Sequence, residues 1–123
     1  MNAEKHSKKD ISMVWCVVLL PRAEMELLAM PADIRARFLH IAELLCAFGP
    51  QQVGMPHVRP LHGKLWEMRM TGRDGIVRGI YVASSGRRLT VLHVFAKRSQ
   101  KTPRQAIATA YARLGRIGRP DSS

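Results

Sequence analysis

The 123-residue chain lacks an apolar stretch long enough to cross a membrane. Its longest apolar run, Met13–Leu20, has eight residues, whereas a membrane-spanning helix needs about 20. The residues before this run are charged and no small-residue cleavage site follows it, so it does not have the pattern of a signal peptide. We therefore expect a cytoplasmic protein with no membrane partner.

Cysteine is also scarce, and the ligand patterns of common metal sites are missing. The two cysteines, Cys16 and Cys46, have no neighbour at the spacing of a metal site or a redox pair, and we interpret both as buried apolar side chains. The sequence contains no HExxH motif, no CxxC motif and no cluster of carboxylates. We expect neither a metal ion nor a cofactor.

Acidic residues almost disappear from the second half of the chain. Residues 1–56 carry six Lys/Arg and six Asp/Glu, whereas residues 57–123 carry fourteen Lys/Arg and three Asp/Glu. The whole net charge of +11 therefore belongs to the second half. Surfaces that only keep a protein soluble usually mix both signs, so this distribution favours a polyanionic partner over the solubility interpretation.

The hydrophobic fraction of 46% can build one core, and we expect one domain over residues 12–115 with flexible tails at 1–11 and 116–123. Apolar residues recur at spacings of three and four from Ile34 to Phe48, which predicts one face of a long helix. Together with the other apolar runs and the turn residues between them, this predicts an order of strand, two helices, three strands and a helix. The short connections between the late strands predict an antiparallel meander, and Thr102 is the expected N-cap of the last helix. The expected elements are strands at 13–20, 64–70, 75–84 and 88–96, helices at 23–30, 32–48 and 104–114, and a loop at 51–63.

Strand alternation divides the late strands into two faces. One face has the apolar sets Trp66, Met68, Met70 and Leu92, Val94, Ala96, which we expect to pack on the long helix. The other face collects polar and charged side chains: Glu67, Arg69, Arg78, His93 and Lys97. Arg78 is assigned to this face from its neighbours alone, because it shares a side of its strand with apolar residues.

This set of side chains suits phosphodiester transfer in RNA. The reaction needs a base for the 2′-hydroxyl proton, cations for the charge on phosphorus, and an acid for the leaving 5′-oxygen. His93 or Glu67 can transfer protons, while the phosphate ligands are expected to be Arg69, Arg78 and Lys97. Phe95 and Tyr81 are candidates for base stacking. The structural alternatives are a purely structural His93, an ion pair for Glu67 and a core position for Tyr81.

Three segments together resemble the phage-derived branch of the RelE/HigB toxins of type II toxin-antitoxin systems. They are Lys64-Leu-Trp-Glu-Met-Arg69, Gly75-Ile-Val-Arg78 with Tyr81, and Leu92-His-Val-Phe-Ala-Lys-Arg-Ser-Gln-Lys-Thr-Pro103. The resemblance covers residues 15–115 and implies an α+β fold of the RelE type, with an antiparallel sheet in the order β-α-α-β-β-β-α and helices on one face. The sequence departs from the family pattern at Gly79, where a larger apolar residue is usual, and at Arg98–Ser99.

The resemblance also implies an activity and partners. The implied activity is metal-independent cleavage of mRNA on the translating ribosome, and the implied partner is an antitoxin with a helix-turn-helix. Arg69, Arg78, His93, Phe95 and Lys97 are the implied active-site positions, followed by Glu67 and Tyr81, and further cations are expected to hold RNA or an acidic antitoxin: Arg73, Arg98 and Lys101. The superfamily also includes gyrase inhibitors and inactive nucleic-acid binders, which remain as alternatives. The sequence leaves the oligomeric state open.

Overall fold

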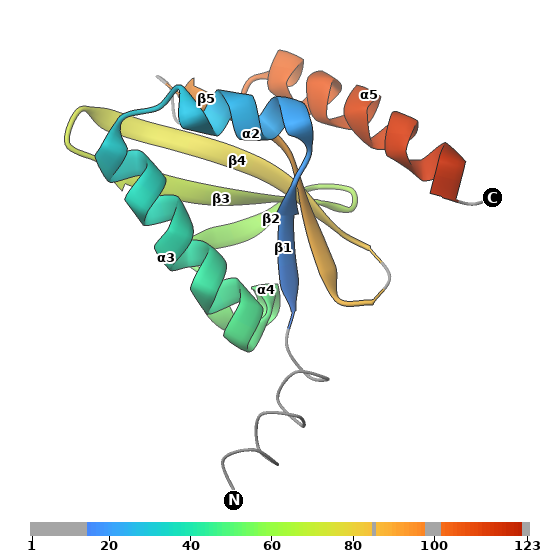
Figure 1. The fold of residues 1–123 in the computed structure, drawn as a ribbon, viewed down its shortest axis with the longest axis horizontal. Helices are drawn as coiled ribbons and strands as arrows, with labels where there is room; N and C mark the ends of the chain where they lie inside the picture. Colours follow the sequence, from blue (N-terminus) through green and yellow to red (C-terminus); the bar gives the residue numbers. More distant parts are fainter. Residues whose placement is uncertain (1–14, 85, 98–101, 122–123) are drawn as a thin grey trace, which may run out of the picture.

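The computed structural model describes residues 15–84, 86–97 and 102–121. Its sheet has five strands in the order β1-β5-β4-β3-β2 (Figure 1). Along the chain the elements are β1 (Cys16–Leu19), α2 (Pro21–Leu28), α3 (Ala32–Phe48), α4 (Pro50–Val53), β2 (Val58–His62), β3 (Leu65–Gly72), β4 (Gly75–Ser84), β5 (Arg88–Lys97) and α5 (Arg104–Asp121). This is a mixed α+β architecture with a mainly antiparallel sheet, as expected.

The predicted meander of β3, β4 and β5 is confirmed, and two further pairings complete the sheet. β2 pairs antiparallel with β3, and β1 pairs parallel with β5. The expected loop at residues 51–63 is therefore wrong, since it contains α4 and β2. The prolines in this segment were interpreted as loop residues. Pro60 nevertheless fits in β2, because an edge strand has only one neighbour and the missing N–H group breaks no hydrogen bond to a second one.

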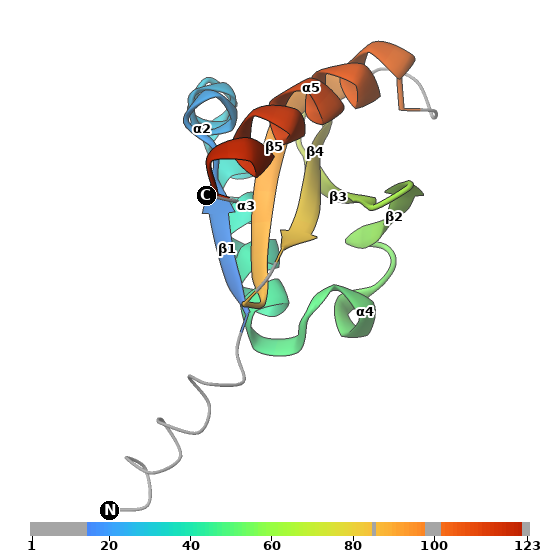
Figure 2. The same cartoon turned by 90° about the vertical axis from the view of Figure 1, so that its right-hand side faces the viewer.

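Helices cover both faces of the sheet, so the expectation of helices on one face is wrong. α3 packs on a core that includes Met68, Met70 and Tyr81, and α5 packs on a second core that includes Leu65 and Ile80. Figure 2 shows α5 crossing in front of β5 and β4 while α3 lies behind the sheet. The side of the sheet predicted to carry the polar residues is therefore also partly apolar, beneath α5.

The periodicity that predicted the long helix is confirmed by burial of one face of α3. Ile34, Phe38, Ile41 and Leu45 are all buried. The helix ends at Gly49, whose φ of +83° lies in the left-handed region that favours glycine. A Cβ atom at Gly49 would lie 2.7 Å from the Trp15 indole nitrogen, so the packing of that side chain also requires glycine.

A bulge in β5 changes the predicted faces. Tyr81 pairs with Val91 whereas Ile80 pairs with His93, which leaves Leu92 as an extra residue on β5. Val94 consequently lies in the α3 core and Leu92 in the α5 core, so the prediction that they share a face is wrong. Simple alternation from the sequence fails here because it assumes one residue of β5 for each residue of β4.

Several smaller expectations are also corrected. The two cysteines are not buried as expected: Cys16 is exposed on β1, which is an edge strand, and Cys46 is partly exposed on α3, outside the buried face of that helix. The helix expected at residues 104–114 is longer than predicted, since α5 continues to Asp121. At Gly79 a Cβ atom would lie 3.0 Å from Met68 Cγ, so the methionine occupies the space of the usual larger residue. No helix within the described residues has the length and apolar character needed to span a membrane.

Candidate active site

Three strands line up the predicted residues in rows across the α5 side of the sheet. Glu67 pairs with Ile80, which pairs with His93; in the next row Arg69 pairs with Arg78, which pairs with Phe95. The inferred position of Arg78 beside Glu67 and Arg69 is therefore confirmed. The backbone of Lys97 continues this arrangement opposite Ile76, and its side chain is outside the described part of the structure.

A buried carboxylate lies at the centre of this arrangement. The Glu67 residue is 1% exposed, and its Oε1 accepts hydrogen bonds from Arg78 Nη1 at 2.7 Å and from Arg59 Nε at 2.9 Å. Its other oxygen accepts a hydrogen bond from the Thr102 hydroxyl. Burial by itself raises the pKa of Glu67, but the bonds from Thr102 and Arg59 and the charge of Arg78 outweigh it, so the pKa is lowered. Glu67 is ionised at neutral pH.

The ion pair holds the Arg78 guanidinium inside the fold. The Arg78 side chain is only 3% exposed, and its Nε has no hydrogen-bond partner within the described residues. A pocket of about 40 Å³ is lined by residues that include Arg59, Glu67, Arg69 and Arg78. The side chains of three arginines therefore meet at one small pocket.

His93 belongs to a neighbouring cluster. Its Nδ1 lies 3.1 Å from Glu26 Oε1, and Arg113 Nη1 lies 3.5 Å from the same nitrogen. The imidazole stacks on the Phe95 ring, with 5.0 Å between ring centroids. Because two strand spacings of about 4.8 Å separate His93 from Glu67, the two backbones are roughly 10 Å apart. His93 and Glu67 therefore lie on either side of Ile80, in the row next to Arg78, and do not touch each other.

The structure does not bring every predicted residue to this site. Tyr81 is fully buried in the α3 core, on the opposite face from Arg78, and stacks on Trp66, so its proposed stacking on RNA bases is wrong and the core interpretation holds. Arg73 lies in the β3–β4 turn, where its N–H donates to Asp33. Arg98 and Lys101 lie outside the described residues.

Four contributing residues were missed from the sequence: Glu26, Arg59, Thr102 and Arg113. Glu26 and Arg113 come from α2 and α5, 87 positions apart, so no local pattern links them. Thr102 was assigned as a helix cap, but its hydroxyl donates to Glu67, and α5 starts at Arg104. Arg59 on β2 pairs directly with Glu67 on β3. Of the four residues, it alone could have been found from the sequence, provided that β2 had been predicted as a strand.

Comparison with known proteins identifies the family. Residues 25–115 match the family described as phage-derived protein Gp49-like (DUF891). The chain belongs to this family. No curated protein matches the Gp49-like chain in sequence.

Solved structures show that this Gp49-like chain has the fold of RelE. An arginine-to-alanine mutant of the Escherichia coli toxin RelE in the free state superposes with a TM-score of 0.56 at 13% identity, covering 82% of this chain and 98% of RelE. The archaeal RelE–RelB complex from Pyrococcus horikoshii OT3 gives a TM-score of 0.52 at 22% identity, covering 68% of this chain and 94% of the matched one. The expected RelE-like fold is therefore confirmed.

Proposed function

We propose that this Gp49-like protein is the toxin of a type II toxin-antitoxin system, an endoribonuclease that cuts mRNA without a metal ion and thereby stops translation. The observation that carries the proposal is the buried Glu67–Arg78 ion pair, which fixes a guanidinium beside Arg69 on the face that also presents His93. A cation held in place before substrate binds stabilises developing phosphate charge without reorganisation in the reaction. The surplus of positive charge in residues 57–123 supports a polyanionic substrate.

The geometry divides the proposed roles. The partly exposed Arg69 binds the scissile phosphate, the almost buried Arg78 adds its positive charge from beside Arg69, and Lys97 is a further candidate ligand from its register position. Glu67 orients Arg78 rather than accepting a proton, because both of its oxygens already accept hydrogen bonds. That leaves His93 as the proton-transfer group. The partly exposed Phe95 is the proposed base-stacking side chain, and RNA further from the cut is held by outlying cations: Arg73, Arg98 and Lys101.

Two partners belong to this proposal. The similarity in fold to a RelE that was solved with RelB supports an antitoxin, here proposed to carry a helix-turn-helix. The second partner is the translating ribosome, which presents the mRNA. We expect the antitoxin gene to adjoin or overlap the gene for this chain.

Induced expression with mapping of cellular mRNA ends tests the proposed function. We expect new mRNA ends with the wild-type chain, and their loss in Arg69→Ala, whose side chain is partly exposed and therefore removable without loss of the fold. Arg37→Ala, an exposed arginine on α3, is the matched control and should cleave like the wild type. Translation arrest without new ends would refute the nuclease, and intact translation with altered DNA supercoiling would indicate the gyrase alternative.

A further inference from the structure

The backbone of His93 is held on both sides by side chains from two helices. Arg113 Nη1, from α5, donates to the Leu92 carbonyl at 2.8 Å, and the Val94 N–H donates to Glu26 Oε1, from α2, at 2.9 Å. These are the two peptide units that flank His93, and they lie at the bulge of β5. Bulges near active sites re-aim a side chain. Here a carboxylate and a guanidinium fix the bulge that directs His93 toward α5.

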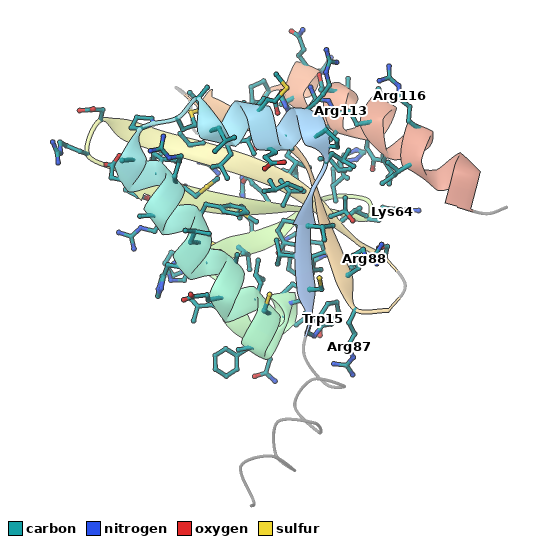
Figure 3. All side chains as sticks on the ribbon, in the orientation of Figure 1. Trp15, Lys64, Arg87, Arg88, Arg113 and Arg116 are labelled. Atoms are coloured by element: carbon teal, nitrogen blue, oxygen red, sulfur yellow. The ribbon has the colours of Figure 1, made fainter. Side chains whose placement is uncertain are left out.

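Glu26 and Arg113 also bind each other. Their contacts form a two-pronged ion pair, with Nη1 3.1 Å from Oε1 and Nη2 2.9 Å from Oε2, where α5 faces α2 (Figure 3). Burial by itself raises the pKa of Glu26, but hydrogen bonds from Arg113, the Val94 N–H and His93 outweigh it and the pKa is lowered. Glu26 is therefore ionised at neutral pH and can only accept hydrogen bonds.

This geometry determines which nitrogen of neutral His93 carries the proton. Glu26 Oε1, an acceptor, lies 3.1 Å from Nδ1. Arg113 Nη1 has two hydrogens, and its two shorter contacts, to Glu26 and to the Leu92 carbonyl, use both of them, so the 3.5 Å contact to Nδ1 has no hydrogen left to donate. The proton thus belongs on Nδ1, and Nε2 holds the lone pair. Within residues 15–84, 86–97 and 102–121, no hydrogen bond reaches Nε2.

We propose that Glu26 and Arg113 are positioning residues that hold His93 as the Nδ1–H tautomer and leave Nε2 to take the proton of the RNA 2′-hydroxyl. This inference rests on the function proposed above. In the step, Nε2 accepts the 2′-hydroxyl proton, the 2′-oxygen bonds to phosphorus, and the bond from phosphorus to the 5′-oxygen breaks. Water gives the 5′-oxygen its proton, and the imidazolium returns its own proton to the resulting hydroxide. The products are a 2′,3′-cyclic phosphate and a 5′-hydroxyl.

A purely structural role predicts something different for the same contacts. The ion pair also joins α2 to α5, so its loss would lower stability whether or not His93 transfers a proton. Stability alone cannot separate the two roles. The tautomer of His93 and the pH dependence of cleavage do, because docking a helix leaves both of them unchanged.

The experiment compares Glu26→Met with the wild-type full-length chain. The control is Glu24→Met, which makes the same chemical change at an exposed position of the same helix. Nitrogen-15 spectra of the imidazole should show the Nδ1–H tautomer in the wild type and in Glu24→Met. Glu26→Met removes the acceptor at Nδ1 and frees the Arg113 Nη1 hydrogen that Glu26 accepts, so Arg113 can donate to Nδ1 and the ring should shift toward Nε2–H. Single-turnover cleavage of ribosome-bound mRNA should then fall roughly 100-fold near neutral pH, with a displaced pH profile and little change in KM.

Arg113→Gln, with exposed Arg116→Gln as its control on the same helix, should give a mixture of tautomers and a rate loss of about 10-fold. An Nε2–H tautomer in the wild type would overturn the inference, and this measurement needs no variant to fold. A Glu26→Met variant that loses thermal stability but keeps the wild-type tautomer and pH profile would overturn it too. In both cases cleavage by the wild type would leave the proposed nuclease standing. A wild type that cuts no RNA would refute the nuclease itself, and the inference with it.

Discussion

The buried Glu67–Arg78 pair yields a prediction whose size follows from the structure. Both side chains are almost inaccessible, at 1% and 3% exposure. Removing either charge leaves the other buried without its partner, and breaking a buried pair in this way costs about 3–5 kcal/mol. The second cation on Glu67, Arg59, is 41% exposed at its side chain and recovers water, so its bond adds under about 1 kcal/mol.

We therefore expect Glu67→Gln and Arg78→Met each to lower the free energy of unfolding by about 3 kcal/mol, out of the roughly 5–15 kcal/mol available to a domain. The double variant removes both charges and should lose about 4 kcal/mol, less than the roughly 6 kcal/mol of the two single losses added together, which corresponds to a coupling energy of about 2 kcal/mol. Urea unfolding at pH 7 measures all four proteins. Glu43→Gln, at an exposed site on α3, is the control and should change stability by less than about 0.5 kcal/mol.

Additive losses in the double variant would refute the reasoning, because they would mean that the two side chains do not depend on each other. The same variants test the proposed positioning of Arg78. Glu67→Gln protein that remains folded in dilute buffer should cleave more slowly than the wild type, since Arg78 is no longer held beside Arg69.

Three further predictions concern stability. The pKa of Glu67 lies below its ordinary value of 4.5, so ionised Glu67 stabilises the fold fully above that pH and this stabilisation is lost as the pH falls through the lowered pKa. The free energy of unfolding should therefore differ less between pH 3 and pH 6 in Glu67→Gln than in the wild type. The Tyr81 hydroxyl is buried without a hydrogen-bond partner among the described residues. Tyr81→Phe should therefore leave toxicity intact and leave the free energy of unfolding in urea unchanged or raise it by up to about 1 kcal/mol. A loss of toxicity would contradict the core assignment. Gly49→Ala should cost about 2 kcal/mol or more, through strain and contact with Trp15, whereas Gly54→Ala meets no neighbouring atom and should cost less; equal losses would show that the contact does not matter.

The sequence predicted the parts of this fold that local patterns encode. The apolar spacing of α3 and the short turns between β3, β4 and β5 require only neighbouring residues, and both predictions are confirmed. β2 was not predicted because it is stable only when paired with β3 at the edge of the sheet. Pro60 is compatible with that edge position, but no local sequence pattern indicates it. The position of α5 on the second face of the sheet was not predicted for a similar reason. The apolar face of α5 packs on Leu65 of β3 and Ile80 of β4, and no pattern within α5 indicates these partners.

The candidate site divides in the same way. Alternation along β3 put Glu67 and Arg69 on one face, whereas Arg78 had to be assigned from its neighbours because its strand does not divide into an apolar and a polar side. The assignment was correct because the register of the tight β3–β4 hairpin is set locally and places Arg78 opposite Arg69. The environment of His93 was not predictable, because it depends on a bulge and on Glu26 and Arg113, 67 and 20 positions away in the chain. Contacts over such separations arise only once the tertiary fold is formed.

The chemistry of the cut ends tests the central claim most directly. Purified wild-type chain should be added to ribosomes translating a defined mRNA in the presence of a chelator that leaves the ribosomes intact, with Arg69→Ala in parallel. We predict new fragments that begin with a 5′-hydroxyl and end in a 2′,3′-cyclic phosphate or its 3′-phosphate hydrolysis product, and no such fragments with Arg69→Ala. Fragments with 5′-phosphate ends, equal cleavage by both proteins, or no cleavage by the wild type would contradict the account.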